Sequence, residues 1–278
     1  MAQAVEALSG DTAVKGEDGR YSAEVGLRWD NRGRPVGAIL SGSMVRAASL
    51  TAGMPTVVST TTEFLYPVEV GGVEISCDIA RRSSALCCVN TVAAQGGRTV
   101  CQGTTWLSSA SGHQSFATAS PEVPNWTELL TGDERLGPGV MTFSGVLEQR
   151  PLVWDADFAN RPETVPRRLA WVRFPPGSAA RDLVTMACEV LVVGDLYPPL
   201  TMMSASPQRG LRALSAQTLE LSAHMGSFDD RSEHLLVETS CEAMSDLMLT
   251  GVVRVWSENR AFRGQVSATY RLPRQRSG

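Results

Sequence analysis

The residues best suited to metal or nucleophilic chemistry are cysteine and histidine, and neither type has the spacing that such chemistry needs. His113, His224 and His234 form no HExxH motif and no cluster with the close ligand spacing of a zinc site. The six cysteines form no CxxC pair and mostly lie in apolar runs, which is typical of reduced, buried thiols. They are Cys77, Cys87, Cys88, Cys101, Cys188 and Cys241. The sequence therefore predicts no metal site and no cofactor.

Other functional motifs and partners are excluded on similar grounds. The chain has no G-x-S-x-G serine elbow, no Walker A motif and no dinucleotide-binding glycine pattern. Its net charge of -4 offers no basic field for nucleic acid. The first 19 residues lack the parts of a signal peptide, and the longest apolar stretch, residues 183–193, is shorter than the ~20 residues of a membrane span. We expect a cytoplasmic protein with neither nucleic acid nor a membrane as partner.

The elements that must position a site repeat once along the chain. The first series opens with a strand at residues 21–29, followed by a helix at residues 34–52 that begins with Arg34-Pro35. Small residues predominate in this helix, which lets its backbone lie close to a sheet. Strand-like patterns follow at residues 56–66, 73–80, 86–94 and 98–107.

The second series has the same order. A strand at residues 168–174 leads to a helix at residues 179–193, with Ser178 as N-cap candidate and Gly194 as the residue that ends it. Strands are predicted at residues 217–225, 235–243, 247–257 and 261–272.

Each series therefore predicts an α+β unit in which one long helix packs on an antiparallel sheet. With 278 residues, the chain divides into four parts. They are a flexible N-terminus (1–19), a first unit (20–110), a linker with extra strands (111–166), one of them at 139–149, and a second unit (167–273).

A helix wrapped by a curved antiparallel sheet is the hotdog unit, and two units in one chain make a double hotdog. The order of motifs resembles the acyl-CoA thioesterase II (TesB-like) family over residues 21–271. The motifs are Tyr21-Ser-Ala-Glu-Val, Trp29, Gly33-x-Pro35-x-Gly37, Thr62-Glu-Phe-Leu-Tyr-Pro-Val68, Trp171-x-Arg173, Gly194-Asp195 and Thr218-Leu-Glu-x-Ser222. The resemblance implies hydrolysis of acyl-CoA thioesters to free acid and CoA by an activated water. It also implies an acyl-CoA or acyl-carrier thioester as partner, and a homo-oligomer.

The resemblance further implies where the chemistry takes place. In the family, an Asp, a Thr and a Gln hold the attacking water; the Asp corresponds to Asp195, at the end of the predicted second helix, and the Thr to Thr218. Backbone N–H groups near Gly37 and Ala38 would face the thioester carbonyl, because the first turn of a helix favours negative charge. The acyl chain would lie in an apolar channel between helix and sheet.

Each of these residues also has a plainer interpretation. Asp195 is equally a residue that ends a helix and bonds a loop N–H, Thr218 an ordinary strand residue, and Gly37 a site of tight helix–sheet packing. Regular alternation puts Thr218 on the polar face of its strand, with Glu220 and His224. Thr218 therefore reaches the channel only through an irregular strand, and Glu220 and His224 stay alternative acid/base candidates.

The Gln of the family has no counterpart in this sequence. Alignment places Ala268 or Val266 there, and Gln265 points to the other face of its strand unless a bulge turns it. A methyl group cannot hold a water, so an alternative function stays open. The alternative is a hotdog protein that binds acyl thioesters and performs non-hydrolytic chemistry (dehydration, isomerisation or a biosynthetic step) or none. A third interpretation is a purely structural partner.

Overall fold

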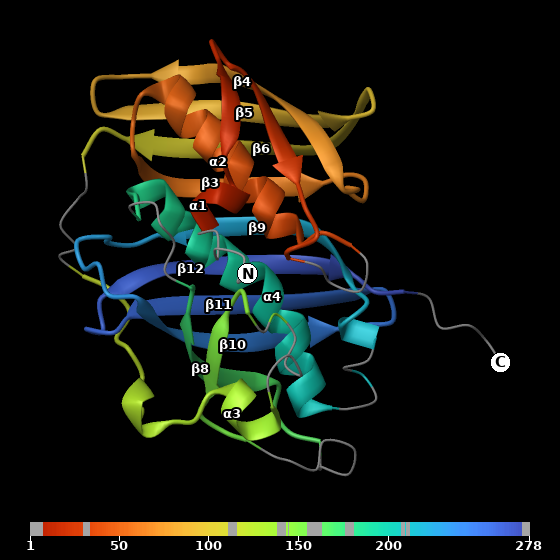
Figure 1. The fold of residues 1–278 in the computed structure, drawn as a ribbon, viewed down its shortest axis with the longest axis vertical. Helices are drawn as coiled ribbons and strands as arrows, with labels where there is room; N and C mark the ends of the chain where they lie inside the picture. The colour runs from red at the N-terminus through yellow and green to blue at the C-terminus, as the bar shows by residue number, and fades with distance from the viewer. Residues whose placement is uncertain are drawn as a thin grey trace, which may run out of the picture.

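The computed structural model describes residues 8–29, 34–110, 116–137, 143, 145–154, 163–175, 181–206, 209 and 212–273 (Figure 1). Twelve strands form one sheet in the order β1-β2-β4-β5-β6-β3-β9-β12-β11-β10-β8-β7. All neighbouring strands are antiparallel, and the pair β3 (Thr56–Phe64) and β9 (Gln217–Met225) joins the two halves. The α+β double hotdog expected from the sequence is therefore the fold of this chain.

The first half contains one long helix, α2, and the strands that curve around it. Its elements are α1 (Leu8–Asp11), β1 (Val14–Glu17), β2 (Arg20–Val25), α2 (Gly37–Ala52), β3, β4 (Gly71–Arg82), β5 (Leu86–Gln95) and β6 (Arg98–Ser108). Side chains alternate along β4 between the face that packs on the helix and the face that is exposed to solvent. Val73, Ile75 and Cys77 are buried, whereas Glu74 is exposed.

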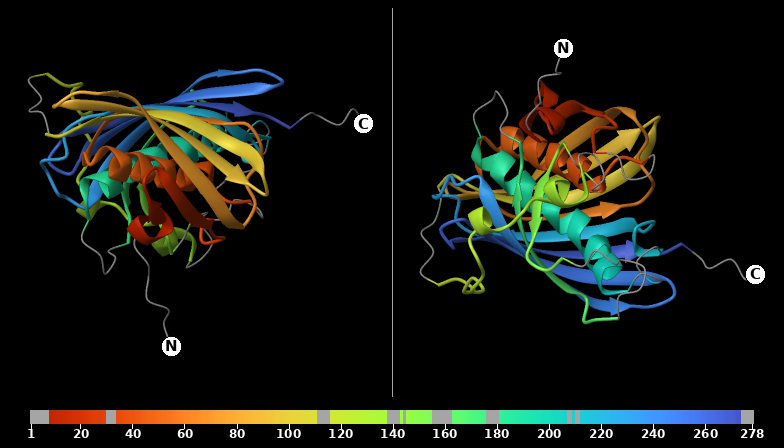
Figure 2. Two further views of the ribbon diagram at one scale, coloured as in Figure 1. Left: turned by 90° about the horizontal axis from the view of Figure 1, so that it is seen from above. Right: turned by 60° about the horizontal axis from the view of Figure 1, so that its bottom comes forward.

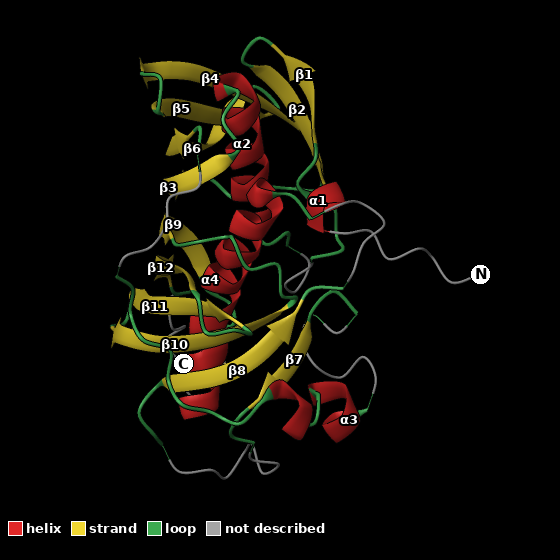
Figure 3. Cartoon of the chain, turned by 90° about the vertical axis from the view of Figure 1, so that its left-hand side faces the viewer, coloured by secondary structure: helices red, strands yellow, loops and turns green. Residues whose placement is uncertain are grey.

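The second half repeats this order around the helix α4. Its elements are η1 (Trp126–Glu128), α3 (Gly132–Leu136), β7 (Glu148–Pro151), β8 (Arg167–Arg173), α4 (Leu183–Ala205), β9, β10 (His234–Met244), β11 (Met248–Ser257) and β12 (Phe262–Arg271). Seen from above, both long helices lie on the same side of the sheet (Figure 2), and α2 and α4 follow one another along it (Figure 3).

The two long helices meet in an antiparallel contact. Ala38 of α2 lies beside Asp195 of α4, whereas Arg46, two turns further along α2, bonds Asp182 at the start of α4. The helices approach closely at Gly42, where an added Cβ atom would lie 3.0 Å from Sγ of Cys188. The small residues of α2 therefore make room for the second helix.

Helix α4 is longer than the sequence patterns predict. It begins after the N-cap Asp182, whose side chain accepts a hydrogen bond from the N–H of Thr185, and it continues past Gly194 to Ala205. The prediction that Gly194 ends the helix was wrong, and Asp195 lies within the helix. Glycine is needed there for packing, because a Cβ atom would lie 2.6 Å from the Val266 side chain. Ser178, the predicted N-cap, lies outside the described residues.

By length and composition alone, α4 is apolar enough to cross a membrane, so the prediction that the apolar stretch is too short was wrong. In the fold, however, 89% of its most apolar 18-residue window is buried inside the protein. The sheet wraps around it, as expected of the core helix of a hotdog unit.

Residues 8–19 contain α1 and β1, so the expectation of a flexible stretch over residues 1–19 was wrong for residues 8–19. Leu8 is buried in the core, and β1 pairs with β2. Asp11 fixes the segment by accepting hydrogen bonds from Arg28 (2.7 Å) and from the indole N–H of Trp29 (2.8 Å). Residues 1–7 lie outside the described part of the chain.

Part of the segment between the halves crosses the outer face of the second half. This outer strap, residues 116–130, covers Trp171, Leu236 and Trp256, which form a small cluster separate from the main core. The indole N–H of Trp171 donates to the carbonyl of Pro124, and that of Trp256 to Thr118. Of the extra strand predicted at residues 139–149, the structure has only β7, which begins at Glu148; residues 138–142 and 144 lie outside the described part.

Candidate active site

Asp195 lies where the two halves meet and receives a hydrogen bond from each of them. Its Oδ2 accepts from the backbone N–H of Ala38, at the first turn of α2 (2.9 Å), and its Oδ1 accepts from Oγ1 of Thr218 on β9 (2.6 Å). Its side chain is buried, and the donors fix both carboxylate oxygens. Three of the four residues predicted from the sequence are thus brought into direct contact.

An irregularity in β9 turns Thr218 toward Asp195. Tyr270 of β12 pairs with Thr218, but the preceding Thr269 pairs with Glu220, so Leu219 is an extra residue in β9. Such a β-bulge shifts the alternation of side chains by one position. It supplies the strand irregularity that the sequence analysis required. Glu220 and His224 follow the regular pattern and are exposed outside the pocket, so the structure does not bring these alternatives to Asp195.

A cavity of about 830 Å³ opens beside Asp195 and is shared by the two halves. Its walls are mainly apolar, and this volume is in the range of small-molecule sites. Arg34 and Arg271 also line it, and both are exposed. The other lining residues are Pro35, Val36, Gly37, Phe64, Leu65, Tyr66, Pro67, Val68, Phe143, Asp195, Leu196, Pro199, Leu200, Leu214, Ser215, Ala216, Gln217, Thr218, Leu219, Tyr270, Leu272 and Pro273.

The first turn of α2 faces this cavity. Gly37 lines it and packs against Phe64, whose ring would be 2.9 Å from an added Cβ atom. N–H groups of a first turn have no partner within their own helix. The two predicted substrate-binding residues therefore have different surroundings. The N–H of Ala38 donates to the Asp195 carboxylate, whereas Gly37 lines the cavity.

Burial raises the pKa of the Asp195 carboxyl above its usual value. The hydrogen bonds from Thr218 and from the Ala38 N–H act in the opposite direction, because they stabilise the ionised form. A carboxylate with a raised pKa is a stronger base than an exposed one.

The face of β12 that meets α4 carries no amide. Val266 packs directly against Gly194, and Ala268 is buried on the same face. Gln265 lies on the opposite face, where its Oε1 accepts a hydrogen bond from Nε of Arg254 (3.1 Å). The structure therefore agrees with the sequence that β12 does not supply the Gln of the family.

Tyr270 is a residue near Asp195 that the sequence analysis did not single out. Its hydroxyl lies 2.8 Å from the carbonyl oxygen of Asp195 and 3.2 Å from that of Gly194. Strand alternation placed Tyr270 on the face of Val266 and Ala268. The available signal was the Pro198-Pro199 pair in α4, because prolines inside a helix leave carbonyls without partners.

Five of the six cysteines are buried, Cys241 is half-buried, and none of them lines the cavity. All six are free, and burial raises the pKa of Cys101 and of Cys188 to about 12, so these groups remain thiols. Within the described ranges, no group of three or more His, Cys, Asp or Glu side chains is placed to hold a metal ion.

Two family models match the chain: the acyl-CoA thioesterase N-terminal domain over residues 26–108 and the acyl-CoA thioesterase C-terminal domain over residues 114–266. The chain belongs to the acyl-CoA thioesterase family, whose activity is hydrolysis of acyl-CoA thioesters. No curated protein sequence gives a significant match.

Solved structures share this fold over nearly their whole length. A putative thioesterase II from Thermobifida fusca is 19% identical, with a TM-score of 0.77 over 97% of this chain and 98% of that one. The acyl-CoA thioesterase II TesB2 from Mycobacterium marinum is 13% identical, with a TM-score of 0.76 over 98% and 100%. The tesB protein of Mycobacterium avium subsp. paratuberculosis is 15% identical, with a TM-score of 0.76 over 96% and 98%. At these identities the likeness concerns the fold.

Proposed function

We propose that this chain hydrolyses acyl-CoA thioesters with Asp195 as the general base. One observation carries the proposal: Thr218 and the first turn of α2 bind the two oxygens of the Asp195 carboxylate at an apolar cavity. Such an arrangement fixes a base beside the volume that an acyl chain would fill. The pocket is built from both halves, so the site depends on the whole chain.

The reaction begins with a water bound beside the Asp195 carboxylate and the Thr218 hydroxyl, which keep their own hydrogen bond. Asp195 takes one proton from the water as the oxygen attacks the thioester carbonyl carbon. Negative charge develops on the carbonyl oxygen, and the N–H of Gly37 stabilises it together with the positive end of the α2 dipole. The carbon–sulfur bond then breaks, and the departing thiolate takes the proton back from Asp195, which leaves a free acid and a thiol.

The carrier that we propose is coenzyme A. Arg34 and Arg271 support this assignment because both line the cavity and are exposed, and guanidinium groups bind phosphate strongly. A comparison of acyl-CoA with the matching acyl-pantetheine, which lacks the nucleotide phosphates, measures this contribution. Equal values of kcat/KM for the two would favour an acyl carrier instead.

Two further proposals concern the protein as a whole. Exposed apolar side chains on the sheet of the first half, at Val58, Ile79 and Val92, support a homo-oligomer, whose mass light scattering would measure. The free cysteines support a cytoplasmic location, because disulfides are rare in reducing compartments.

The first prediction is that Asp195→Asn abolishes thiol release. An amide cannot take a proton from water, so we expect kcat to fall about 10²-fold or more, the range seen when a general base is lost. The assay follows free thiol from acyl-CoAs of short to long chain length. Asp11→Asn is the matched control, because Asp11 is a hydrogen-bonded carboxylate remote from the cavity, and it should retain turnover.

The two outcomes of this assay separate the candidate functions. Turnover that survives Asp195→Asn would remove Asp195 from the mechanism. Binding of acyl-CoA by the wild type without thiol release at any chain length would favour the non-hydrolytic alternative. The observation that motivates that alternative is the absence of an amide at Val266 and Ala268, the two positions that align with the Gln of the family.

A further inference from the structure

The turn of α4 that carries Asp195 is incompletely hydrogen-bonded within the helix. In an α-helix, each N–H donates to the carbonyl four residues before it. Pro198 and Pro199 lie inside α4 and have no N–H, so the carbonyls of Gly194 and Asp195 lack their helical donors. A buried carbonyl without a hydrogen-bond donor lowers the stability of the folded state, so we expect another group to donate to these two carbonyls.

The Tyr270 hydroxyl lies at these two carbonyls. It is 2.8 Å from the Asp195 carbonyl oxygen and 3.2 Å from that of Gly194, and the Tyr270 side chain is almost fully buried. Burial raises the pKa of the Tyr270 phenol well above its usual value, so the hydroxyl stays protonated and can donate a hydrogen bond. The single hydroxyl proton of Tyr270 thus serves both carbonyls that the two prolines leave without an N–H, and the Asp195 carbonyl is the nearer of the two.

Tyr270 and Thr218 are directly opposite each other on neighbouring strands. Tyr270 bonds the backbone of Asp195, and Thr218 bonds its carboxylate. The same pair of positions therefore fixes Asp195 at both its main chain and its side chain. The Leu219 bulge next to Thr218 creates this arrangement, because it brings Thr218 to the inner face, where the regular alternation of β12 already places Tyr270.

We propose that Tyr270 is a positioning residue for the hydrolytic reaction, in which its hydroxyl substitutes for the missing N–H groups of Pro198 and Pro199 and holds Asp195 in place. The inference rests on the proposed role of Asp195 as base. Tyr270 itself acts through Asp195 and takes no part in the proton transfers.

The test is Tyr270→Phe, which removes only the hydroxyl. We expect kcat to fall about 10- to 100-fold with KM little changed, since a displacement of about 1 Å in a catalytic group has an effect of this order. The matched control is Tyr197→Phe, which removes another buried tyrosine hydroxyl of the α4 region, bonded to Gln149 (3.3 Å) and not to Asp195. A Tyr270→Phe enzyme that melts lower, as Tyr197→Phe does, but keeps the wild-type kcat would overturn the proposal.

A second variant tests the stated cause. Pro199→Ala in the Tyr270→Phe background returns an N–H that can reach the Asp195 carbonyl, and we expect it to recover part of the lost kcat. No recovery, in a folded double variant, would show that the hydroxyl acts in another way and would overturn the proposal. Asp195→Asn, assayed alongside, keeps the two proposals apart. If Asp195→Asn retains turnover, the role of Asp195 as base fails, and the positioning role of Tyr270 fails with it. If Asp195→Asn loses turnover while Tyr270→Phe is unaffected, only the positioning role is overturned.

Discussion

At the scale of single residues, burial and two hydrogen bonds act in opposite directions on the pKa of Asp195. Burial raises its pKa, and the donors Thr218 and Ala38 lower it. The base works in its ionised form, so turnover should rise with pH through this pKa and level off above it. The position of that rise therefore reports how well each donor stabilises the carboxylate.

Thr218→Val is expected to move the rise of kcat to higher pH. Valine has nearly the shape of threonine but cannot donate a hydrogen bond. The pKa of Asp195 should therefore rise, because the hydrogen bond from Thr218 lowers it. The plateau should also fall, because the attacking water loses one of its partners. A kcat profile measured from pH 4.5 to 9 tests both effects, and an unmoved rise would contradict the hydrogen bond to the ionised form.

At the scale of elements, the sequence predicts the strands well because burial on one face leaves a clear alternation. The pattern at residues 73–80 falls entirely within β4, and the predicted strand at residues 217–225 coincides with β9. The end of α4 was misplaced because a glycine that ends a helix and one that permits close packing look alike in a sequence. Gly194 is the second kind, and only the position of Val266 reveals it.

The site was predictable only in part for the same reason. Asp195 and Thr218 followed from a family resemblance, but their contact depends on the extra residue Leu219, which leaves no mark on the apolar pattern. Tyr270 acts on carbonyls that two prolines leave free, and those prolines lay beyond the predicted end of the helix. A local pattern does not encode a relation between distant residues of this kind.

Gly194→Ala should separate α4 from β12. A Cβ atom there would lie 2.6 Å from the Val266 side chain, a distance that forces movement. Overpacking of a core typically costs about 1–3 kcal/mol, and about 2–4 °C of Tm per kcal/mol applies to chains of roughly this size. Thermal unfolding measures the effect. Gly26→Ala is the control, because an added Cβ atom there meets nothing within 4 Å, and equal Tm losses in the two variants would refute the packing argument.

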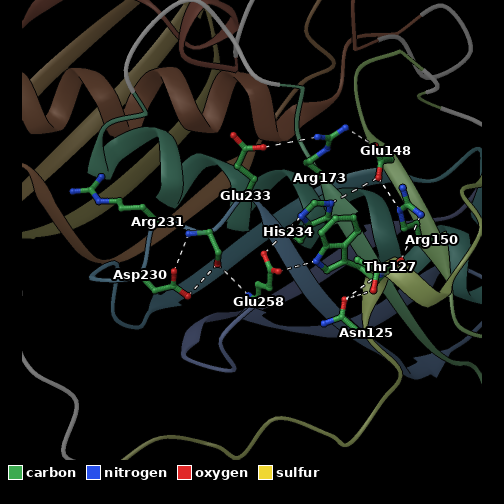
Figure 4. A network of polar contacts seen from close by, with 12 residues as sticks. Asn125, Thr127, Glu148, Arg150, Arg173, Asp230, Arg231, Glu233, His234 and Glu258 are labelled. Atoms are coloured by element: carbon green, nitrogen blue, oxygen red, sulfur yellow. Dashed lines mark hydrogen bonds and ion pairs between the residues drawn. The ribbon is translucent and has the colours of Figure 1, made fainter.

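At the scale of the whole molecule, the outer strap is fastened to the second half by a network around His234 (Figure 4). The Trp126 ring stacks on His234 with centroids 3.7 Å apart, and its indole N–H donates to Glu258 (2.8 Å). Glu148 and Glu258 lie on either side of the imidazole. Arg173 and Arg150 are the neighbouring cations.

Low pH should weaken the attachment of the outer strap to the second half. Burial, followed by Arg173, lowers the pKa of His234, although Glu148 and Glu258 oppose the shift. The unfolded chain then binds a proton more readily than the folded one. The contribution to stability is therefore complete above the unfolded pKa of about 6.5 and is lost as the pH falls through that value toward the folded pKa.

Urea unfolding at pH 7.5 and pH 5 tests this prediction. We expect the free energy of unfolding to fall less between the two pH values in His234→Gln than in the wild type, since glutamine does not titrate. An equal fall in both proteins would mean that other groups govern the acid response.

The antiparallel helices have a consequence for stoichiometry. The first turn of each helix packs against the middle of the other helix. The two hotdog units therefore have equivalent positions, one at the start of α2 and one at the start of α4. At the start of α2 the facing residue is Asp195; at the start of α4 it is Arg46, which bonds Asp182 (2.8 Å) and Thr185 (2.9 Å). A guanidinium cannot accept a proton from water. We therefore expect only the position at the start of α2 to bind substrate, and titration with a non-hydrolysable acyl-CoA analogue should count one binding equivalent for every two hotdog units.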